Sequence, residues 1–411
     1  MSADGDTLLR HRPNSRGRGR EVTVLRDVGD DAGDPELDDI RDDVSLELEE
    51  VNEVLAALIA EHAERRARDA EILTLRLGIR GDRPETLATI GARFDLARDR
   101  IRQVHTKAVG QLVRHAQLTG RRGGVFAERY PLGARDSQLL RTLLMETYAT
   151  DTDIAAHELS YLKLRLAGHA AEDAKRVAGF VMQRILAWRK KTNARLTKLQ
   201  PPPPTGELEP ALAQVDWPSG ASAPLPGESA RIVDADDDGR GRFYLDKVGR
   251  DVAFDSGLEA RLLRLLTASD AVQTFQETPS AVTYQLDGAD RVAYPTVAAR
   301  LTDGRVVLID VQPLGHIGFH TNRARSAAAR AYAHDKGWGW AIWTGSRLGV
   351  PDLLHRKVDA TVESRLGELI TTGPVYWHAL REIRDLTALD LIALTLRHEW
   401  RWDRGPFTLS A

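Results

Sequence analysis

The sequence predicts a multidomain protein that joins a helical N-terminal half to a C-terminal α/β part containing one mixed sheet. Apolar residues recur at helical spacing through much of residues 46–199. The four prolines at 201–204 end this pattern, because proline lacks an amide donor and clashes with the preceding helical turn. From residue 243 onward, helical segments alternate with strand-like runs that are separated by Asp-Gly turns.

Composition limits the class of protein. The chain has 411 residues, a net charge of −3 and no cysteine. Its length predicts about two or three domains, and the absence of cysteine excludes disulfides and suits a reducing compartment. No apolar run approaches the roughly 20 residues of a membrane helix, and the start of the chain lacks a hydrophobic signal region. We therefore expect a cytoplasmic protein without a membrane partner.

The first 35 residues are poor in apolar side chains and predict a disordered arm. A basic run at 10–20, suited to phosphate contacts, precedes an acidic run at 27–50. The acidic run continues into a helix, for which we expect a solvated acidic face. The alternative is an acidic segment that covers the recognition helix, which begins near Ala97, until DNA displaces it.

Residues 86–112 predict two short amphipathic helices joined by a tight turn. The first starts at Thr86, a suitable N-cap, and ends near residue 94. The second begins near Ala97 and buries the apolar residues Ile101, Val104, Ala108 and Leu112. The residues between them must face outward, as in the second helix of a DNA-reading helix-turn-helix. This outward row consists of Arg98, Asp99, Arg102 and Gln103.

Residues 70–112 resemble region 4 of primary bacterial sigma factors, which binds the promoter −35 element through a helix-turn-helix. Matching positions combine core and surface residues, from Ile72, Leu73 and Arg76 through Thr86, Gly91 and Phe94 to Arg98, Arg102, Gln103, Lys107 and Leu112. The resemblance implies that Arg98, Asp99, Arg102, Gln103 and Lys107 contact DNA. Their chemistry suits direct readout, since arginine pairs with guanine, glutamine with adenine, and a carboxylate accepts from cytosine N4.

Two departures from the family pattern affect the expected target. Asp99 stands where glutamate is usual, and His105 stands where an acidic residue is usual. The target sequence is therefore expected to differ from a −35 box. A sigma factor also needs a helical domain that grips RNA polymerase, and the first 40 residues are too polar to supply it, so we do not expect a free-standing initiation factor. The structural alternative is a helical hairpin with a solvated charged face.

The region from 36 to 122 is thus predicted to be the helix-turn-helix domain, and residues 123–200 a helical extension. The end of this extension is basic, which fits either a solvated face or phosphate tracking. Residues 201–240 have a Pro- and Gly-rich composition without periodicity and predict a linker at the main domain boundary. The basic residues at the end of the helical extension are Arg184, Arg189, Lys190, Lys191, Arg195 and Lys198.

The predicted α/β domain covers residues 241–347. Residues 255–266 form an amphipathic helix containing Glu259, and strand-like runs follow at 281–286, 292–301 and 305–311. An alanine-rich helix at 322–334 and an apolar strand at 337–343 complete it. This order predicts a helix, a three-stranded meander, a helix and a final strand.

Residues 243–345 resemble the PD-(D/E)XK nucleases, most closely the TnsA-like transposase endonuclease subunits, and so imply a restriction-endonuclease-like fold. In that family a helix glutamate, the aspartate of a Pro-Asp pair and an acid-x-Lys strand motif gather magnesium at the scissile phosphate. The corresponding positions are Glu259, Thr296 after Pro295, and Asp310 with Gln312. Thr296 replaces a metal-binding aspartate and Gln312 replaces the lysine, so the predicted catalytic site is degenerate.

Three interpretations of Glu259, Asp310 and Gln312 follow. They are remnants of a catalytic site on a scaffold that now binds only DNA or protein, which we expect. Alternatively, Glu259 and Asp310 hold one magnesium ion with help from His320 or His334 and support altered hydrolysis. In the third interpretation the sheet is unrelated to nucleases and both acids are ordinary polar residues. No cofactor is expected unless the nuclease interpretation holds.

Residues 348–411 predict a helical segment through 396 and an aromatic tail with Trp400, Trp402 and Phe407 among arginines. Such interleaving can stack on single-stranded bases. We expect instead that the tail is buried in the core or docked on a partner.

The expected function is that of a nucleoid-associated transcriptional regulator that reads double-stranded DNA without catalysis. The alternative is a metal-dependent DNA endonuclease of transposon or defence type that the helix-turn-helix directs to its site. A third hypothesis is an RNA polymerase partner, because region 4 also contacts the polymerase β-flap. Transposase-type proteins and a second copy of this chain are further candidate partners.

Overall fold

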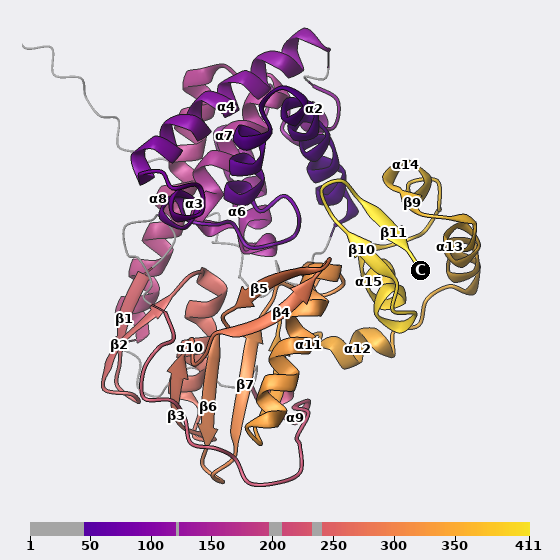
Figure 1. Ribbon diagram of the computed structural model, residues 1–411. Helices are drawn as coiled ribbons and strands as arrows, with labels where there is room; N and C mark the ends of the chain where they lie inside the picture. Colours follow the sequence, from indigo (N-terminus) through magenta and orange to yellow (C-terminus); the bar gives the residue numbers. More distant parts are fainter. Residues whose placement is uncertain (1–44, 121–122, 197–207, 232–240) are drawn as a thin grey trace, which may run out of the picture. The chain divides into compact units, whose positions relative to one another are not determined.

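A computed structural model describes residues 45–120, 123–196, 208–231 and 241–411 (Figure 1). All of them belong to one compact unit, Glu36–Ala411. The N-terminal half is helical and the C-terminal half contains mixed sheets with helices, which confirms the predicted combination of α and α/β parts. The predicted arm at 1–35 and the basic side chains from Arg189 to Lys198 lie outside the described residues or side chains.

The helical half is built around one apolar core that runs through most of its helices. Leu58 and Leu73 of the first helix, Leu112 of the helix-turn-helix and Leu162 are fully buried in this core. The helices are α2 (Leu46–Leu77), α3 (Leu87–Phe94), α4 (Arg98–Leu118), α5 (Val125–Arg129), α6 (Asp136–Thr150), α7 (Ala156–Ala167) and α8 (Ala171–Leu196), with the short η1 (Asp153–Ala155) before α7.

The acidic first turns of α2 dock on the C-terminal end of the chain. The Glu49 carboxylate lies 2.9 Å from the Arg404 guanidinium, and the backbone N–H of Phe407 donates to Glu53 at 2.6 Å. Burial raises the pKa of Glu49, although the adjacent Arg404 opposes this effect. The expectation of a solvated acidic face is therefore wrong for these residues, because their partners lie more than 300 positions away in the sequence.

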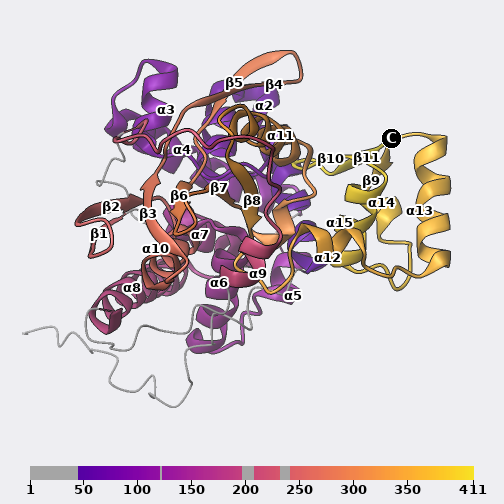
Figure 2. The same ribbon diagram turned by 90° about the horizontal axis from the view of Figure 1, so that it is seen from below.

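A four-stranded sheet organises the C-terminal half. Its order is β3 (Val272–Glu277), β6 (Val297–Leu301), β7 (Val306–Val311) and β8 (Gly339–Trp343), and only the β7–β8 pair is parallel. Helix α10 (Gly257–Ala268) packs on one face and α11 (His320–Asp335) on the other (Figures 1 and 2). Every residue of β7 is buried, as expected for a strand covered on both faces.

The predicted three-stranded meander is only partly correct. Strand β4 (Val282–Leu286) pairs with β5 (Ala289–Ala293) in a separate hairpin, while β6 and β7 form the sheet hairpin. The expected strand at 292–301 is interrupted because Pro295 cannot donate a ladder hydrogen bond. Asp287 and Gly288 adopt φ of 52° and 76°, which the two-residue hairpin turn requires. Strands β1 (Gly241–Leu245), β2 (Arg250–Phe254) and β3 were not expected from the sequence.

Residues 208–231 fall in the predicted linker but pack on the sheet. Helix α9 (Leu208–Ala213) buries Leu208, and Asp216 exchanges backbone hydrogen bonds with Trp340 of β8. The Trp338 indole donates to the Ala223 carbonyl at 2.8 Å. Irregular backbone can thus cover a sheet when its polar groups find partners, and composition alone does not reveal this.

The aromatic tail is part of a buried core, as expected, and its Trp402 and Phe407 side chains are each 2% exposed. Trp402 packs edge-on against Phe319 with ring centroids 4.9 Å apart. The alternative prediction, that these rings stack on single-stranded bases, is therefore wrong for this conformation. The tail elements are α12 (Val350–Leu354), α13 (Ala360–Thr372), α14 (Trp377–Leu380), α15 (Ala388–Arg397) and the three-stranded sheet of β9 (Val375–Tyr376), β10 (Arg401–Asp403) and β11 (Thr408–Ser410), with the short η2 (Leu314–His316) preceding α11.

A buried polar cluster connects α4 with α2 and α7. The Arg76 guanidinium lies 2.8 Å from the Glu158 carboxylate and donates to the Ile154 carbonyl at 2.7 Å. His105 on α4 is 4% exposed beside this pair. Burial lowers the pKa of His105 from 6.5 to about 4, while Glu158 opposes the shift. The imidazole is therefore neutral in the folded protein at pH 7 and contributes to the packing of α4.

This shift predicts a loss of stability in mild acid that depends on His105. The unfolded chain takes up the proton near pH 6.5, whereas the folded chain takes it up only near pH 4, so the contribution is complete above 6.5 and is lost as the pH falls toward 4. Between pH 7.5 and 4.5 the wild-type protein should lose about 2.5 kcal/mol more unfolding free energy than His105→Gln. Urea unfolding of both full chains at the two pH values measures the difference, and equal pH dependence would contradict it.

Candidate nucleic-acid interface and buried acidic centre

Helices α3 and α4 form the predicted helix-turn-helix. Thr86 caps α3, because its Oγ1 accepts from the Thr89 backbone N–H at 2.9 Å. The helix ends at Asp95, which is in the left-handed region with φ of 53°. A Cβ on Gly91 would come within 2.5 Å of the Leu96 carbonyl oxygen, so the tight turn requires glycine at this position. The buried residues that join the two helices are Ile72, Leu87, Ile90, Ile101 and Val104.

All five side chains that the sequence predicts to contact DNA are exposed on α4. Asp99 and Arg102 form an ion pair at 2.9 Å, with side-chain exposures of 76% and 66%. Gln103 accepts a hydrogen bond from Arg100 at 3.2 Å. Surface pairs of this kind contribute only about 0–1 kcal/mol, so a ligand can separate them at little cost. The five residues are Arg98, Asp99, Arg102, Gln103 and Lys107.

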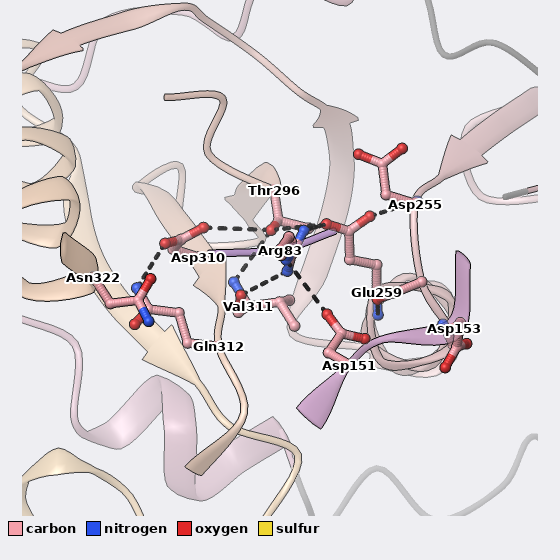
Figure 3. A network of polar contacts seen from close by, with 12 residues as sticks. Arg83, Asp151, Asp153, Asp255, Glu259, Thr296, Asp310, Val311, Gln312 and Asn322 are labelled. Carbon is pink, nitrogen blue, oxygen red and sulfur yellow. Dashed lines mark hydrogen bonds and ion pairs between the residues drawn. The ribbon is translucent and has the colours of Figure 1, made fainter. Parts of the chain in front are cut away.

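The second predicted site is also assembled, at the carboxyl end of β7. Glu259 from α10 and Asp310 from β7 are 6% and 4% exposed, and both face Thr296 (Figure 3). The Thr296 hydroxyl lies 3.5 Å from a carboxylate oxygen of each acid and accepts from the Val311 backbone N–H at 3.1 Å. We call these three residues, together with the adjacent Arg83 and Asp151, the acidic centre.

Glu259 has a partner for each of its two carboxylate oxygens. Oε2 accepts from the Asp255 backbone N–H at 2.7 Å, just before the Ser256 N-cap of α10. Oε1 accepts from the guanidinium of Arg83. The Ser-Gly-Leu-Glu sequence at 256–259 is a helix-capping pattern, so Glu259 has a structural role that does not depend on catalysis.

Gln312 lies beside Asp310 on the face covered by α11. Its amide donates to the Asp310 carboxylate at 2.8 Å and to the Ser326 hydroxyl at 2.6 Å. Arg325, also from α11, places its guanidinium 3.5 Å from the same carboxylate oxygen. Gln312 therefore positions Asp310 through one hydrogen bond from a neutral amide, while Arg325 supplies positive charge.

Arg83 and Asp151 belong to the acidic centre but were not predicted from the sequence. Arg83 lies in the loop between α2 and α3, and Asp151 follows α6. The Arg83 guanidinium contacts Glu259, lies 3.4 Å from the Asp151 carboxylate and donates to the Val311 carbonyl at 2.7 Å (Figure 3). Arg83 and Glu259 are 176 positions apart, so no local pattern signals their contact.

Electrostatics fix the charge state of this arginine. Burial alone disfavours the charged guanidinium, but Glu259, Asp151 and Asp310 together raise the pKa of Arg83 above its usual range. Burial raises the pKa of Asp151 to about 6, although Arg83 opposes the shift. Arg83 is therefore a permanent positive charge within the centre.

The histidines considered as metal ligands do not join Glu259 and Asp310. The His334 ring lies 3.3 Å from Asp216, and His320 lies 3.8 Å from Asp287. His316 is buried, and desolvation lowers its pKa well below the usual range. Within the described ranges, no group of three or more histidine, aspartate or glutamate side chains is arranged to hold a metal ion.

The acidic centre opens into a cleft of about 1010 Å³. The cleft lies between the loop of Arg83, the start of α3 and the β4–β5 hairpin, and its walls are rich in charged side chains of both signs. The arginines in the lining are Arg80, Arg83, Arg93, Arg231, Arg291, Arg325 and Arg404.

In the part of the chain with defined structure, no helix has both the length and the apolar composition of a membrane span.

A comparison with known protein families identifies the helix-turn-helix. Residues 66–113 match the family Sigma-70, region 4. The matched stretch includes the end of α2, the Arg83 loop, all of α3 and most of α4, and it contains every predicted DNA-contacting residue. The sequence resemblance at 70–112 is thereby confirmed. The chain therefore carries a helix-turn-helix of the sigma-70 region 4 type, which indicates DNA binding.

Proposed function

We propose that this chain is a sequence-specific double-stranded DNA-binding protein that acts as a transcriptional regulator. Its C-terminal half would be a nuclease-like scaffold that makes further DNA or protein contacts without catalysis. The observation that carries the proposal is the exposed row of Arg98, Asp99, Arg102 and Gln103 within the region 4 match. These side chains project from the first two turns of α4, the part of a recognition helix that reaches base edges.

The chemistry of the row supports base readout rather than backbone contact alone. Arg102 can pair bidentately with a guanine once it leaves Asp99, and Asp99 can then accept from a cytosine N4 amine. Both base contacts become possible when the exposed ion pair between Asp99 and Arg102 opens. Lys107 lies one turn further along α4 and suits a phosphate contact.

The acidic centre supports the non-catalytic interpretation over the endonuclease alternative. Both Glu259 oxygens have protein donors, and Asp310 has Gln312 and Arg325 as partners. Magnesium in nucleases needs carboxylate oxygens that are free to bind it and its substrate. In this arrangement protein groups already occupy both oxygens of Glu259 and the Oδ2 atom of Asp310.

The DNA-reading role predicts a base-specific effect of Arg102→Ala. The variant should lose about 1–3 kcal/mol of binding free energy at one base pair and relax sequence preference there. Selection from a random duplex library would identify the site, and fluorescence anisotropy with single-base variants would measure the loss. Arg114→Ala, which removes an exposed arginine further along the same helix, is the matched control. A uniform loss over all sequences would assign Arg102 to phosphate contacts instead.

The scaffold role predicts that the full chain does not cut DNA. Supercoiled plasmid carrying the selected site should remain intact in magnesium or manganese, and Glu259→Gln should behave as the wild type does. Gel analysis after prolonged incubation measures this. Nicking or linearisation that depends on Glu259 would establish the endonuclease alternative.

A further inference from the structure

We propose that the guanidinium of Arg83 is the built-in cation of the acidic centre and occupies the position that a divalent metal ion would otherwise take. It contacts two carboxylates, Glu259 and Asp151, and one main-chain carbonyl, that of Val311. Carboxylate and carbonyl oxygens are also the ligands that magnesium and calcium prefer. The inference goes beyond the proposed function, because it would stand even if α4 bound no DNA.

The charges around the centre are consistent with an arginine in place of a metal. Asp255 pairs with Arg231, Asp310 pairs with Arg325, and Arg83 contacts Glu259 and Asp151. These four carboxylates each have an arginine partner in the folded chain, while Asp153 accepts from the Gly257 backbone N–H at 2.9 Å. A divalent ion entering this arrangement would have to displace Arg83 from Glu259, and the charge of Arg83 is stabilised there by Glu259, Asp151 and Asp310.

The loop that carries Arg83 is anchored by the two residues just before it. Gly81 has φ of 85°, and a Cβ there would come within 2.6 Å of the Phe319 ring. Asn322 at the start of α11 donates to the Gly81 carbonyl at 3.3 Å, and Thr321 donates to the Asp82 carboxylate at 3.1 Å. Contacts with Phe319 and with the start of α11 therefore fix the loop that places Arg83 in the acidic centre.

Removal of the guanidinium should therefore create a divalent-cation site. Without Arg83, the carboxylates of Glu259 and Asp151 lose their shared counter-charge while remaining buried close to Asp310. A divalent ion can restore that charge through the same oxygens. In the wild-type chain a divalent ion competes with Arg83 for these oxygens. Because the guanidinium is covalently tethered beside them, we expect the wild-type chain not to bind the ion there.

The test compares thermal unfolding of full chains in EDTA and in magnesium, calcium or manganese chloride up to 10 mM. Arg83→Ala should melt below the wild type in EDTA and regain about 3 °C as the divalent ion saturates. The wild type and Arg80→Ala, which removes an exposed arginine from the same loop, should not respond. Arg83→Ala combined with Glu259→Gln should lose the response.

A second pair of variants keeps the test decisive if Arg83→Ala does not fold. Arg83→Gln removes the charge but keeps most of the side chain, and it should gain the divalent response. Arg83→Lys keeps a cation and should not. The proposal is overturned if the neutral variants ignore divalent ions, or if the wild type shows a response that depends on Glu259. No DNA enters these measurements, so failure of the DNA-binding proposal would not affect them.

Discussion

Buried carboxylates must be paired with positive charge, and this requirement shapes the contact between the two halves of the structure. Glu259, Asp310 and Asp151 are at most 6% exposed, so water reaches little of their surface. An unpaired buried charge costs far more than a surface one, and removal of one partner from such a pair costs about 3–5 kcal/mol. Arg83 meets the requirement for two of the acids with a single side chain.

This solution ties the acidic centre to the helix-turn-helix. Arg83 lies three positions before Thr86, the residue that caps α3, so the loop that enters the centre also sets the start of the DNA-reading unit. Meanwhile α4 directs its polar row away from the core, and His105 and Val104 on its other side are buried. The short segment from Arg83 to Thr86 therefore supplies the counter-charge of the acidic centre and also sets the start of the helix-turn-helix. The polar row of α4 remains exposed.

The sequence carries local information well and distant pairing poorly. Helices α3, α4 and α10 follow from apolar periodicity and α11 from its alanine content. The β4–β5 and β6–β7 turns follow from Asp-Gly pairs. All of these signals lie within a few residues. Glu259, Asp310 and Thr296 were found through the spacing of a known motif, and the structure does bring them together. Arg83 was missed because its role depends on a contact across 176 positions, which nothing near either residue encodes. The packing of Glu49 on Arg404 was missed for the same reason.

The neutral residues at positions 296 and 312 fit a centre built around a guanidinium. An aspartate at 296 would place a third carboxylate against Glu259 and Asp310, each of which lies 3.5 Å from the Thr296 hydroxyl. A divalent ion could offset that charge, but a single guanidinium could not. A lysine at 312 would add a cation beside Arg325, which already pairs with Asp310. Thr296 and Gln312, which depart from the nuclease motif, therefore supply hydrogen bonds without changing a charge balance that Arg83 and Arg325 maintain.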